Sequence, residues 1–141
     1  MNDRYLYRAK RTDNGEWITG YLLVKKKDFY ICEKPYECMD EYSSLNGQSY
    51  GFGGFKFVYP STICQCTGLK DKNGKMIWEN DITLRTSVTG THKGKIIYSS
   101  DGSFCQKNFE TTFENLLIHS ESYFEVIGNI FDNPELLEVG E

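Results

Sequence analysis

The feature that most constrains the fold of this chain is the pair Asn73-Gly74, which lies between two short apolar segments. Asn and Gly both accept the positive φ that a two-residue β-hairpin turn requires. Leu69 precedes the pair and Met76-Ile77-Trp78 follows it. We therefore predict an antiparallel hairpin here, with Lys72 and Lys75 at its exposed tip.

Short apolar or alternating segments separated by turn residues recur along most of the chain. They predict strands at residues 5–9, 17–24, 29–32, 55–59, 63–66, 82–88, 95–99, from 104, and at 123–130. Asn14-Gly15 and Asp101-Gly102 supply turns, so residues 5–24 are predicted to form a hairpin. The polar stretches 33–48 and 90–94 are predicted to be loops.

Two segments favour short helices. Phe109, Phe113, Leu116 and Leu117 recur at helical spacing, which predicts a helix near residues 112–119. Asn133 followed by Pro134 is typical of an N-cap and first helical position, so a last helical turn should begin there.

Short strands joined by tight turns, with few helices, indicate a mainly β protein built as a small barrel or curled sheet. The block from residue 76 to 131 has the strand count of an SH3-like barrel. We predict an N-terminal β lobe over residues 1–69 and an SH3-like barrel with a C-terminal helical turn over residues 70–141. With 141 residues, of which 39% are hydrophobic and 15% aromatic, the chain has enough apolar material for a packed interior.

The chain carries no apolar run near the roughly 20 residues that span a bilayer, and residues 1–10 do not have the pattern of a signal peptide. We therefore expect a cytoplasmic protein without membrane contact. The chain has five cysteines, an odd number, and no CxxC pair. We therefore expect small, buried, reduced cysteines and no disulfide framework. A zinc site built from Cys32, Cys38, Cys64 and Cys66 is the alternative, but the spacing matches no standard motif, and we predict no metal and no cofactor.

Three segments resemble the YopX family of phage and prophage proteins. They are residues 65–75 continuing through Ile77, Glu79, Asp81 and Ile82; residues 125–130 followed by 133–137; and, more weakly, residues 14–17 with Gly20-Tyr21. The resemblance implies a phage or prophage gene product in a bacterial host cell, a fold that contains an SH3-like barrel, and no assigned biochemical activity. Asn80 stands where the family usually has Gly, and the turn should survive because Asn tolerates positive φ.

The residues of the matched motifs are better explained by structural roles than by catalytic ones. Gly128 inside a strand indicates a bulge or a close backbone approach, and Asn129 in an apolar strand needs a hydrogen-bonding partner. We assign structural roles to the motif residues Thr67, Gly68, Asn73, Gly74, Asp81, Gly128, Asn129, Asn133 and Pro134.

No catalytic motif is found in the sequence. The histidines, His92 and His119, are isolated, and the cysteines have no His near them in sequence. The segment from Gly51 to Tyr59 resembles the aromatic strand of RNA-recognition modules, but its leading basic residue is missing and the two long helices of that module are absent. An aromatic core strand after a Gly-rich loop is the favoured interpretation.

The charge is uneven and disfavours general nucleic-acid binding. The net charge is −4, with +1 over residues 1–69 and −5 over residues 70–141, and no Lys or Arg follows Lys107. Such an acidic end repels a phosphate backbone, although Lys70, Lys72, Lys75, Lys93 and Lys95 could form a local basic strip.

The leading hypothesis is a non-enzymatic accessory protein that works through protein–protein contact with a host or phage protein, and a homo-oligomer is left open. The alternatives are a nucleic-acid-binding module that uses the basic strip and a small enzyme with a site at Cys105 or His119.

Overall fold

The structure is a computed structural model that describes residues 5–33, 55–111 and 113–137. The chain forms two compact units. The first unit is Tyr5–Gln65 and the second begins at Cys66, whereas the sequence prediction put the boundary between residues 69 and 70. No helix in the described ranges is long and apolar enough to cross a membrane.

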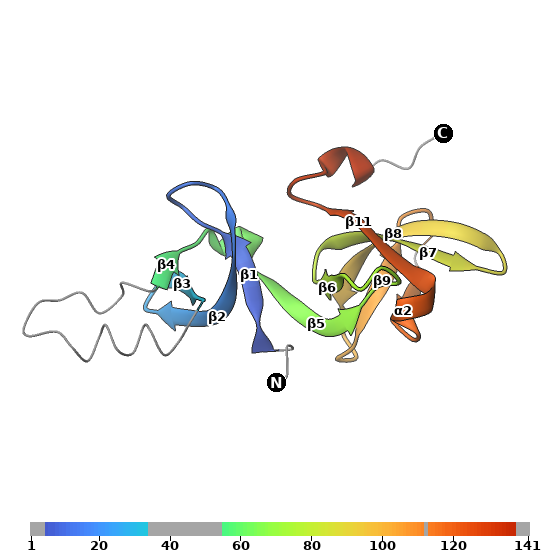
Figure 1. The fold of residues 1–141 in the computed structure, drawn as a ribbon, viewed down its shortest axis with the longest axis horizontal. Coiled ribbons are helices and arrows are strands. Elements are labelled where there is room, and N and C mark those ends of the chain that lie inside the picture. Colours follow the sequence, from blue (N-terminus) through green and yellow to red (C-terminus); the bar gives the residue numbers. More distant parts are fainter. Residues whose placement is uncertain (1–4, 34–54, 112, 138–141) are drawn as a thin grey trace, which may run out of the picture. The chain divides into compact units, whose positions relative to one another are not determined.

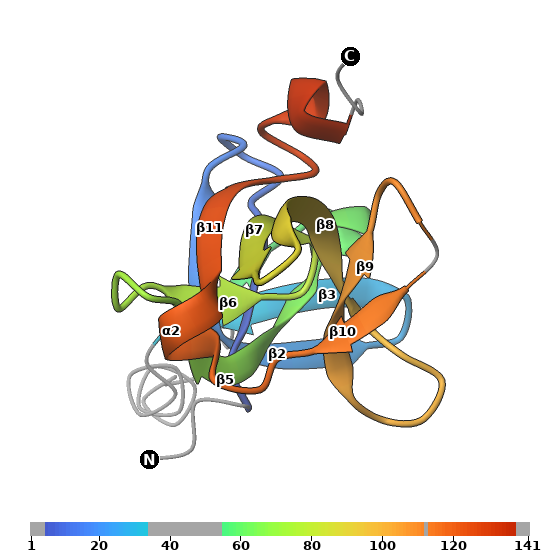
Figure 2. The same cartoon turned by 90° about the vertical axis from the view of Figure 1, so that its right-hand side faces the viewer.

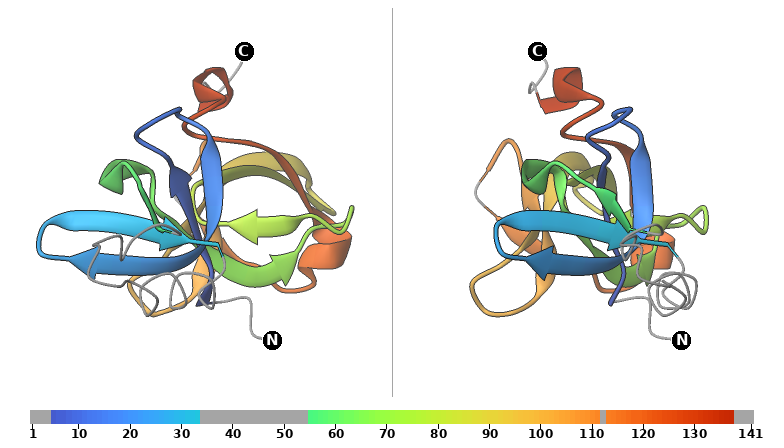
Figure 3. Two further views of the ribbon diagram at one scale, coloured as in Figure 1. Left: turned by 60° about the vertical axis from the view of Figure 1, so that its left-hand side comes forward. Right: turned by 90° about the vertical axis from the view of Figure 1, so that its left-hand side faces the viewer.

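The first unit is an antiparallel sheet with the strand order β4-β3-β2-β1-β5 (Figures 1 and 3). Its elements are β1 (Tyr7–Lys10), β2 (Trp17–Lys25), β3 (Asp28–Cys32), β4 (Phe55–Phe57), the 3₁₀ turn η2 (Pro60–Thr62) and the start of β5 (Cys64–Lys70). Ala9 pairs with Ile18 across β1 and β2, and both are buried together with Ile31 and Val58. The predicted hairpin over residues 5–24 is therefore confirmed.

The second unit contains the end of β5 and β6 (Met76–Trp78), followed by a five-stranded antiparallel sheet with the order β10-β9-β8-β7-β11. The remaining elements are β7 (Asp81–Ser87), β8 (Gly90–Tyr98), β9 (Phe104–Asn108), β10 (Glu114–Leu116), α2 (Ser120–Tyr123), β11 (Phe124–Asn129) and the 3₁₀ turn η3 (Pro134–Leu137). Its core consists of Ile77, Ile96, Leu117, Phe124 and Val126.

The Asn73-Gly74 hairpin is confirmed. Gly74 has a φ of 80°, and the N–H of Asp71 donates to the carbonyl of Lys75 at 2.8 Å to close the turn. The carboxylate of Asp71 accepts the N–H groups of Asn73 and Lys75 at 2.9 and 2.8 Å. An aspartate that bonds its own turn in this way fixes the turn conformation.

The predicted helix at residues 112–119 is wrong. Residues 114–116 form β10, which pairs with β9 from Glu114 opposite Lys107 to Leu116 opposite Cys105. The side chain of Asn108 accepts the N–H groups of Glu110 and Thr111 at 2.7 and 3.2 Å, so the chain turns back on β9 instead of continuing into a helix.

The predicted loop at residues 90–94 is also wrong, because β8 already begins at Gly90. Its polar residues pair along β7, with Thr91 opposite Thr86 and His92 opposite Arg85. Cross-strand pairing therefore overrides the loop-like composition of this segment.

The mainly β class is confirmed, but the SH3-like barrel is not. In the described residues the five-stranded sheet is open, with β10 at one edge and β11 at the other (Figure 2). The outer edge of β11 is covered by the β5–β6 hairpin instead: the N–H of Val126 donates to Asp71 Oδ2 at 2.8 Å, and the N–H of Lys72 donates to the carbonyl of Phe124 at 2.9 Å.

The expectation that all cysteines are reduced is wrong at Cys32, which is disulfide-bonded. Cys64, Cys66 and Cys105 are free and buried, as expected of small core residues. Cys38 and most of the predicted loop at residues 33–48 lie outside the described residues, as does the Gly-rich start of the aromatic segment at 51–59.

Candidate interaction groove

An open groove of about 410 Å³ lies in the second unit, between three short segments of chain. They are residues 67–69 at the end of β5, residues 102–104 at the start of β9, and residues 116–118 at the end of β10. Each segment has a local structure that explains why its side chains are available there.

The β5 segment is a bulge. The pairing of β5 with β6 shifts between Cys66 and Lys70, and Gly68 has a φ of 80°, a conformation that glycine adopts without strain. The Thr67 hydroxyl holds the bulge in place, because it donates to the carbonyl of Ile77 at 2.7 Å and accepts the N–H of Leu69 at 3.1 Å. The bulge leaves Leu69 40% exposed beside the groove.

The β9 segment follows a tight turn. The N–H of Gly102 donates to the carbonyl of Ser99, and the N–H of Ser99 donates to the carbonyl of Ser103 at 2.8 Å. Asp101 accepts hydrogen bonds from the Ser99 hydroxyl and the Ser103 N–H. The hydrogen bond from Ser99 lowers the pKa of the Asp101 carboxyl, and this carboxylate adjoins the lining residue Gly102 in the sequence.

The third segment alternates between the core and the solvent. Leu117 is buried in the core of the second unit, whereas its neighbours Leu116 and Ile118 are 49% and 60% exposed. Together with Leu69 they give the groove an exposed aliphatic lining. Such a lining binds an apolar side chain by removing it from water.

Cys105 lies next to the groove but has the wrong environment for a nucleophile. Its side chain is buried, and Sγ lies 3.8 Å from Glu114 Oε1. Burial and the adjacent Glu114 carboxylate raise the pKa of the Cys105 thiol, which suppresses the thiolate that reacts. His119 occupies the N-cap position of α2 without a capping hydrogen bond from its side chain, and its ring packs against Tyr123 with the ring centroids 6.2 Å apart.

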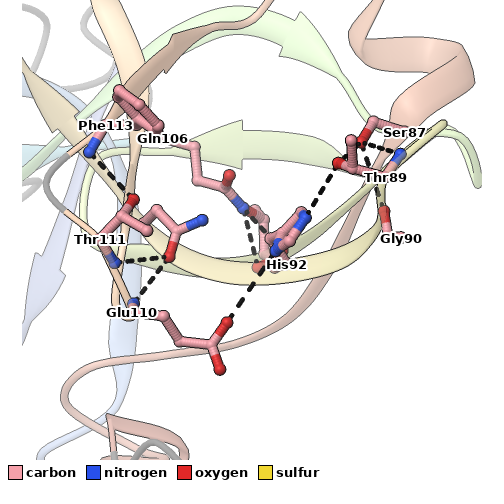
Figure 4. A network of polar contacts seen from close by, with 10 residues as sticks. Ser87, Thr89, Gly90, His92, Gln106, Glu110, Thr111 and Phe113 are labelled. Carbon is pink, nitrogen blue, oxygen red and sulfur yellow. Dashed lines mark hydrogen bonds and ion pairs between the residues drawn. The ribbon is translucent and has the colours of Figure 1, made fainter.

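A second polar cluster joins β7, β8 and β9 (Figure 4). The fully buried Gln106 donates from Nε2 to the carbonyl of Thr83 at 3.1 Å and to its hydroxyl at 2.9 Å. The ring of His92 lies between the Thr89 hydroxyl, at 3.3 Å from Nε2, and Glu110, at 3.9 Å from Nδ1. The Gln106 hydrogen bonds join β9 to β7 across the intervening strand β8, and the His92 contacts join β8 to the turn before it and to the chain after β9. Both are structural roles.

The motif residues singled out in the sequence occupy turns and bulges. Thr67 and Gly68 line the groove. Asp81 Oδ2 accepts the N–H of Trp78 at 2.8 Å and follows Asn80, which has the expected positive φ, at 72°. The ladder of β11 shifts at Gly128 as predicted.

The predicted need of Asn129 for a partner is met at the end of β11. Its Oδ1 accepts the N–H groups of Phe131 and Asp132, each at 2.9 Å. Asn133 Oδ1 accepts the N–H of Asn129 at 3.1 Å, so this side chain reaches back to β11 while Pro134 begins η3.

Sequence reasoning missed Asp71, which is 2% exposed and bonds both its own turn and β11. A signal was present, because an Asp two residues before Asn-Gly is typical of a side-chain-stabilised turn.

The five lysines of the proposed basic strip lie in two places. Lys70, Lys72 and Lys75 belong to the β5–β6 hairpin, and Lys93 and Lys95 belong to β8. Lys72 Nζ lies 3.7 Å from Glu125 Oε1. Glu125 is paired with Leu84 across β11 and β7, and Leu84 is paired with Lys93 across β7 and β8. An acidic and an apolar residue therefore separate the two lysine groups. In the described ranges no three metal-ligating side chains come together.

The family profile described as YopX protein matches residues 6–138, nearly the whole chain. This chain belongs to the YopX family. Its groove therefore lies within the matched region, and Thr67 and Gly68 belong to residues 65–75, one of the segments that resemble the family. No curated protein matches the chain. The crystal structure of protein EF1440 from Enterococcus faecalis is similar in fold, with 24% identity, a TM-score of 0.53, and coverage of 94% of this chain and 96% of that one.

Proposed function

We propose that this YopX-family protein is a non-enzymatic accessory protein of phage or prophage origin that acts in the bacterial cytoplasm by binding another protein through the groove of its second unit. The observation that carries the proposal is the exposed aliphatic lining of Leu69, Leu116 and Ile118. Apolar side chains gathered in a concave surface are typical of protein contact sites.

The surroundings of the groove support a protein partner over a nucleic acid. Asp101 and Glu114 stand beside the lining segments, and no Lys or Arg follows Lys107 in the sequence. A phosphate backbone is repelled by such a rim. The alternative, nucleic-acid binding through Lys70, Lys72, Lys75, Lys93 and Lys95, is weakened by the Lys72–Glu125 ion pair.

Photo-crosslinking tests the proposal directly. A photoreactive residue is placed at Ile118, in the groove, and in a matched protein at Val88, an exposed apolar residue in the turn between β7 and β8. In a lysate of the host bacterium we expect a discrete protein adduct from position 118 that position 88 does not give. The same adducts from both positions, or none from either, contradict the proposal.

The affinity for the partner should also depend on the apolar side chains of the groove. Ile118→Ser removes exposed apolar surface from the groove, and Val88→Ser removes a similar surface elsewhere. Because a buried aliphatic side chain contributes about 1.5–3 kcal/mol to an interface, Ile118→Ser should weaken capture of the crosslinked protein by about tenfold or more. Val88→Ser should leave it unchanged.

A further inference from the structure

We infer that the partner contributes an extended segment that adds to the sheet as a new antiparallel strand along β10, with an apolar side chain beside Leu116 and a basic side chain beside Glu114. The inference rests on the proposed function and specifies the chemistry of the partner. Strand addition of this kind uses main-chain hydrogen bonds for affinity and alternate side chains for specificity.

In the described residues, β10 is the open edge of its sheet. In the described residues β10 pairs on one side only, with β9. The opposite edge strand, β11, is already covered by Asp71 and Lys72 of the β5–β6 hairpin. An uncovered edge presents unpaired N–H and C=O groups, which is a template for another strand.

The hydrogen bond of Phe113 with β9 shows which backbone groups of β10 face outward. The N–H of Asn108 donates to the carbonyl of Phe113 at 3.0 Å, so these two residues form a hydrogen-bonded pair. In an antiparallel ladder such pairs alternate with pairs whose polar groups point away. The backbone groups of Glu114 and Leu116 therefore point to the open edge, whereas those of Asn115 point to β9.

A new strand along β10 would meet a defined pattern of side chains. Glu114 lies in the same cross-strand row as Lys107, and Leu116 lies in the row of the buried Cys105. A residue added beside Glu114 meets a carboxylate, and one added beside Leu116 meets an apolar row that leads into the groove. Opposite charges and apolar pairs in such rows are favourable.

The charges around the groove also bear on the partner segment. Described residues around the lining segments include Asp101, Glu114 and Glu121, and the cations beside these segments are Lys70, next to Leu69, and Lys107, opposite Glu114. Glu114 and Leu116 are two residues apart, so their partners are also two apart. The added strand runs antiparallel to β10, so its residue beside Leu116 comes before its residue beside Glu114. From the N- to the C-terminus, the partner segment therefore has an apolar residue, then any residue, then a basic residue.

The test uses synthetic peptides of eight residues in which Thr and Val alternate around a central Val-Thr-Lys. Two matched peptides carry Val-Thr-Glu and Lys-Thr-Val. Binding to the full chain is followed by ¹H–¹⁵N NMR. We expect Val-Thr-Lys to bind about fivefold more tightly than Val-Thr-Glu, with the largest amide shifts at Glu114 and Leu116. Equal affinity for all three peptides, or shifts confined to other strands, would overturn the inference.

Two variants test the register. Leu116→Pro deletes an outward N–H and leaves the β9 ladder intact, because proline is tolerated at an edge strand where its nitrogen faces solvent; it should reduce peptide binding at least tenfold. Glu114→Lys should reverse the preference, so that Val-Thr-Glu binds best. This reversal is a gain of binding that an unfolded variant cannot produce. If neither variant changes the peptide preference, the result contradicts strand addition.

The outcomes separate the inference from the proposed function. Crosslinking of a protein at position 118 without any peptide preference would keep the groove as a binding site and reject strand addition. Failure of the crosslink with a clear peptide preference would reject the groove as the contact site and keep the edge. Failure of both rejects both.

Discussion

The carboxylate of Asp71 accepts the backbone N–H of Val126 at 2.8 Å, across 55 residues of the chain. The same side chain accepts two N–H groups of its own turn. One buried aspartate therefore fixes the β5–β6 hairpin and attaches it to β11.

Replacing Asp71 with Asn should destabilise the protein. The amide of Asn has one acceptor oxygen, so a donor N–H₂ would face at least one of the three backbone N–H groups. Hydrogen bonds to a charged group contribute about 1.5–3 kcal/mol, and we expect a loss of about 2–3 kcal/mol in the free energy of unfolding, measured by urea denaturation. Asp101→Asn, in an exposed turn, is the matched control and should cost less; an equal loss in both variants contradicts the role assigned to Asp71.

The Asp71 contribution should vanish in acid. Burial alone would raise the pKa of Asp71, but the hydrogen bonds from Val126, Lys75 and Asn73 outweigh it and lower the pKa. A carboxylate whose pKa is depressed in the folded state stabilises the protein above the unfolded-state pKa of about 3.9. This stabilisation is lost as the pH falls through the folded-state pKa. The difference in unfolding free energy between the wild type and Asp71→Asn should be constant from pH 7 to 5 and shrink below pH 4. A difference that grows on acidification would have the wrong sign.

Gly74 should be sensitive to β-branching for a purely conformational reason. A Cβ at this position would have nothing within 4 Å, and the φ is 80°. Gly74→Val should therefore cost about 1 kcal/mol or more through backbone strain alone. Gly74→Asn should cost clearly less, because Asn tolerates this region; thermal melts of the two variants give the comparison.

Gly128 and Asn133 should be energetically coupled. A Cβ on Gly128 would lie 2.5 Å from Asn133 Oδ1 and 2.9 Å from Leu136 Cδ1. Gly128→Ala should cost about 1–3 kcal/mol and expose the Asn129 amide to hydrogen exchange. In an Asn133→Ala background the same change should cost less, since the oxygen that it displaces is gone. Additive effects in this double-mutant cycle would show that the two sites are independent.

Generic duplex DNA should bind weakly at physiological salt. Five lysines in full contact with phosphates would give a salt slope of about −4, but Lys72 is paired with Glu125. We expect a shallower slope and dissociation constants above the micromolar range in titrations of labelled duplex and single-stranded oligonucleotides. Sub-micromolar binding that Lys72→Glu with Lys75→Glu weakens would favour the nucleic-acid alternative.

Turn chemistry made much of this fold predictable. Asn14-Gly15, Asn73-Gly74 and Asp101-Gly102 lie at hairpin turns as expected, because the glycine of each pair takes a positive φ, which specifies the backbone locally. The helix over 112–119 failed because spacing alone cannot report that Asn108 terminates β9 and turns the chain back on it. The prediction of a loop at the polar start of β8 was wrong for a similar reason. The strand conformation there depends on pairing with β7, which the local composition does not show.

The groove was less predictable than the fold. Thr67 and Gly68 were identified as turn residues, but their position opposite Leu116 and Ile118 depends on contacts between segments about 50 residues apart. Exposure of an aliphatic side chain cannot be inferred from its identity. Three of the residues proposed to bind the partner, Glu114, Leu116 and Ile118, lie in the segment to which sequence periodicity assigned a helix.

The cover over β11 determines what assemblies the five-stranded sheet can support. A sheet with two open edges can recruit strands without limit and grow into a fibre. Here the hairpin around Asp71 and Lys72 occupies one edge from within the same chain, so in the described residues each copy of this sheet offers a partner a single open edge, at β10. The expected product is a discrete complex of one-to-one stoichiometry, whose size does not increase with concentration.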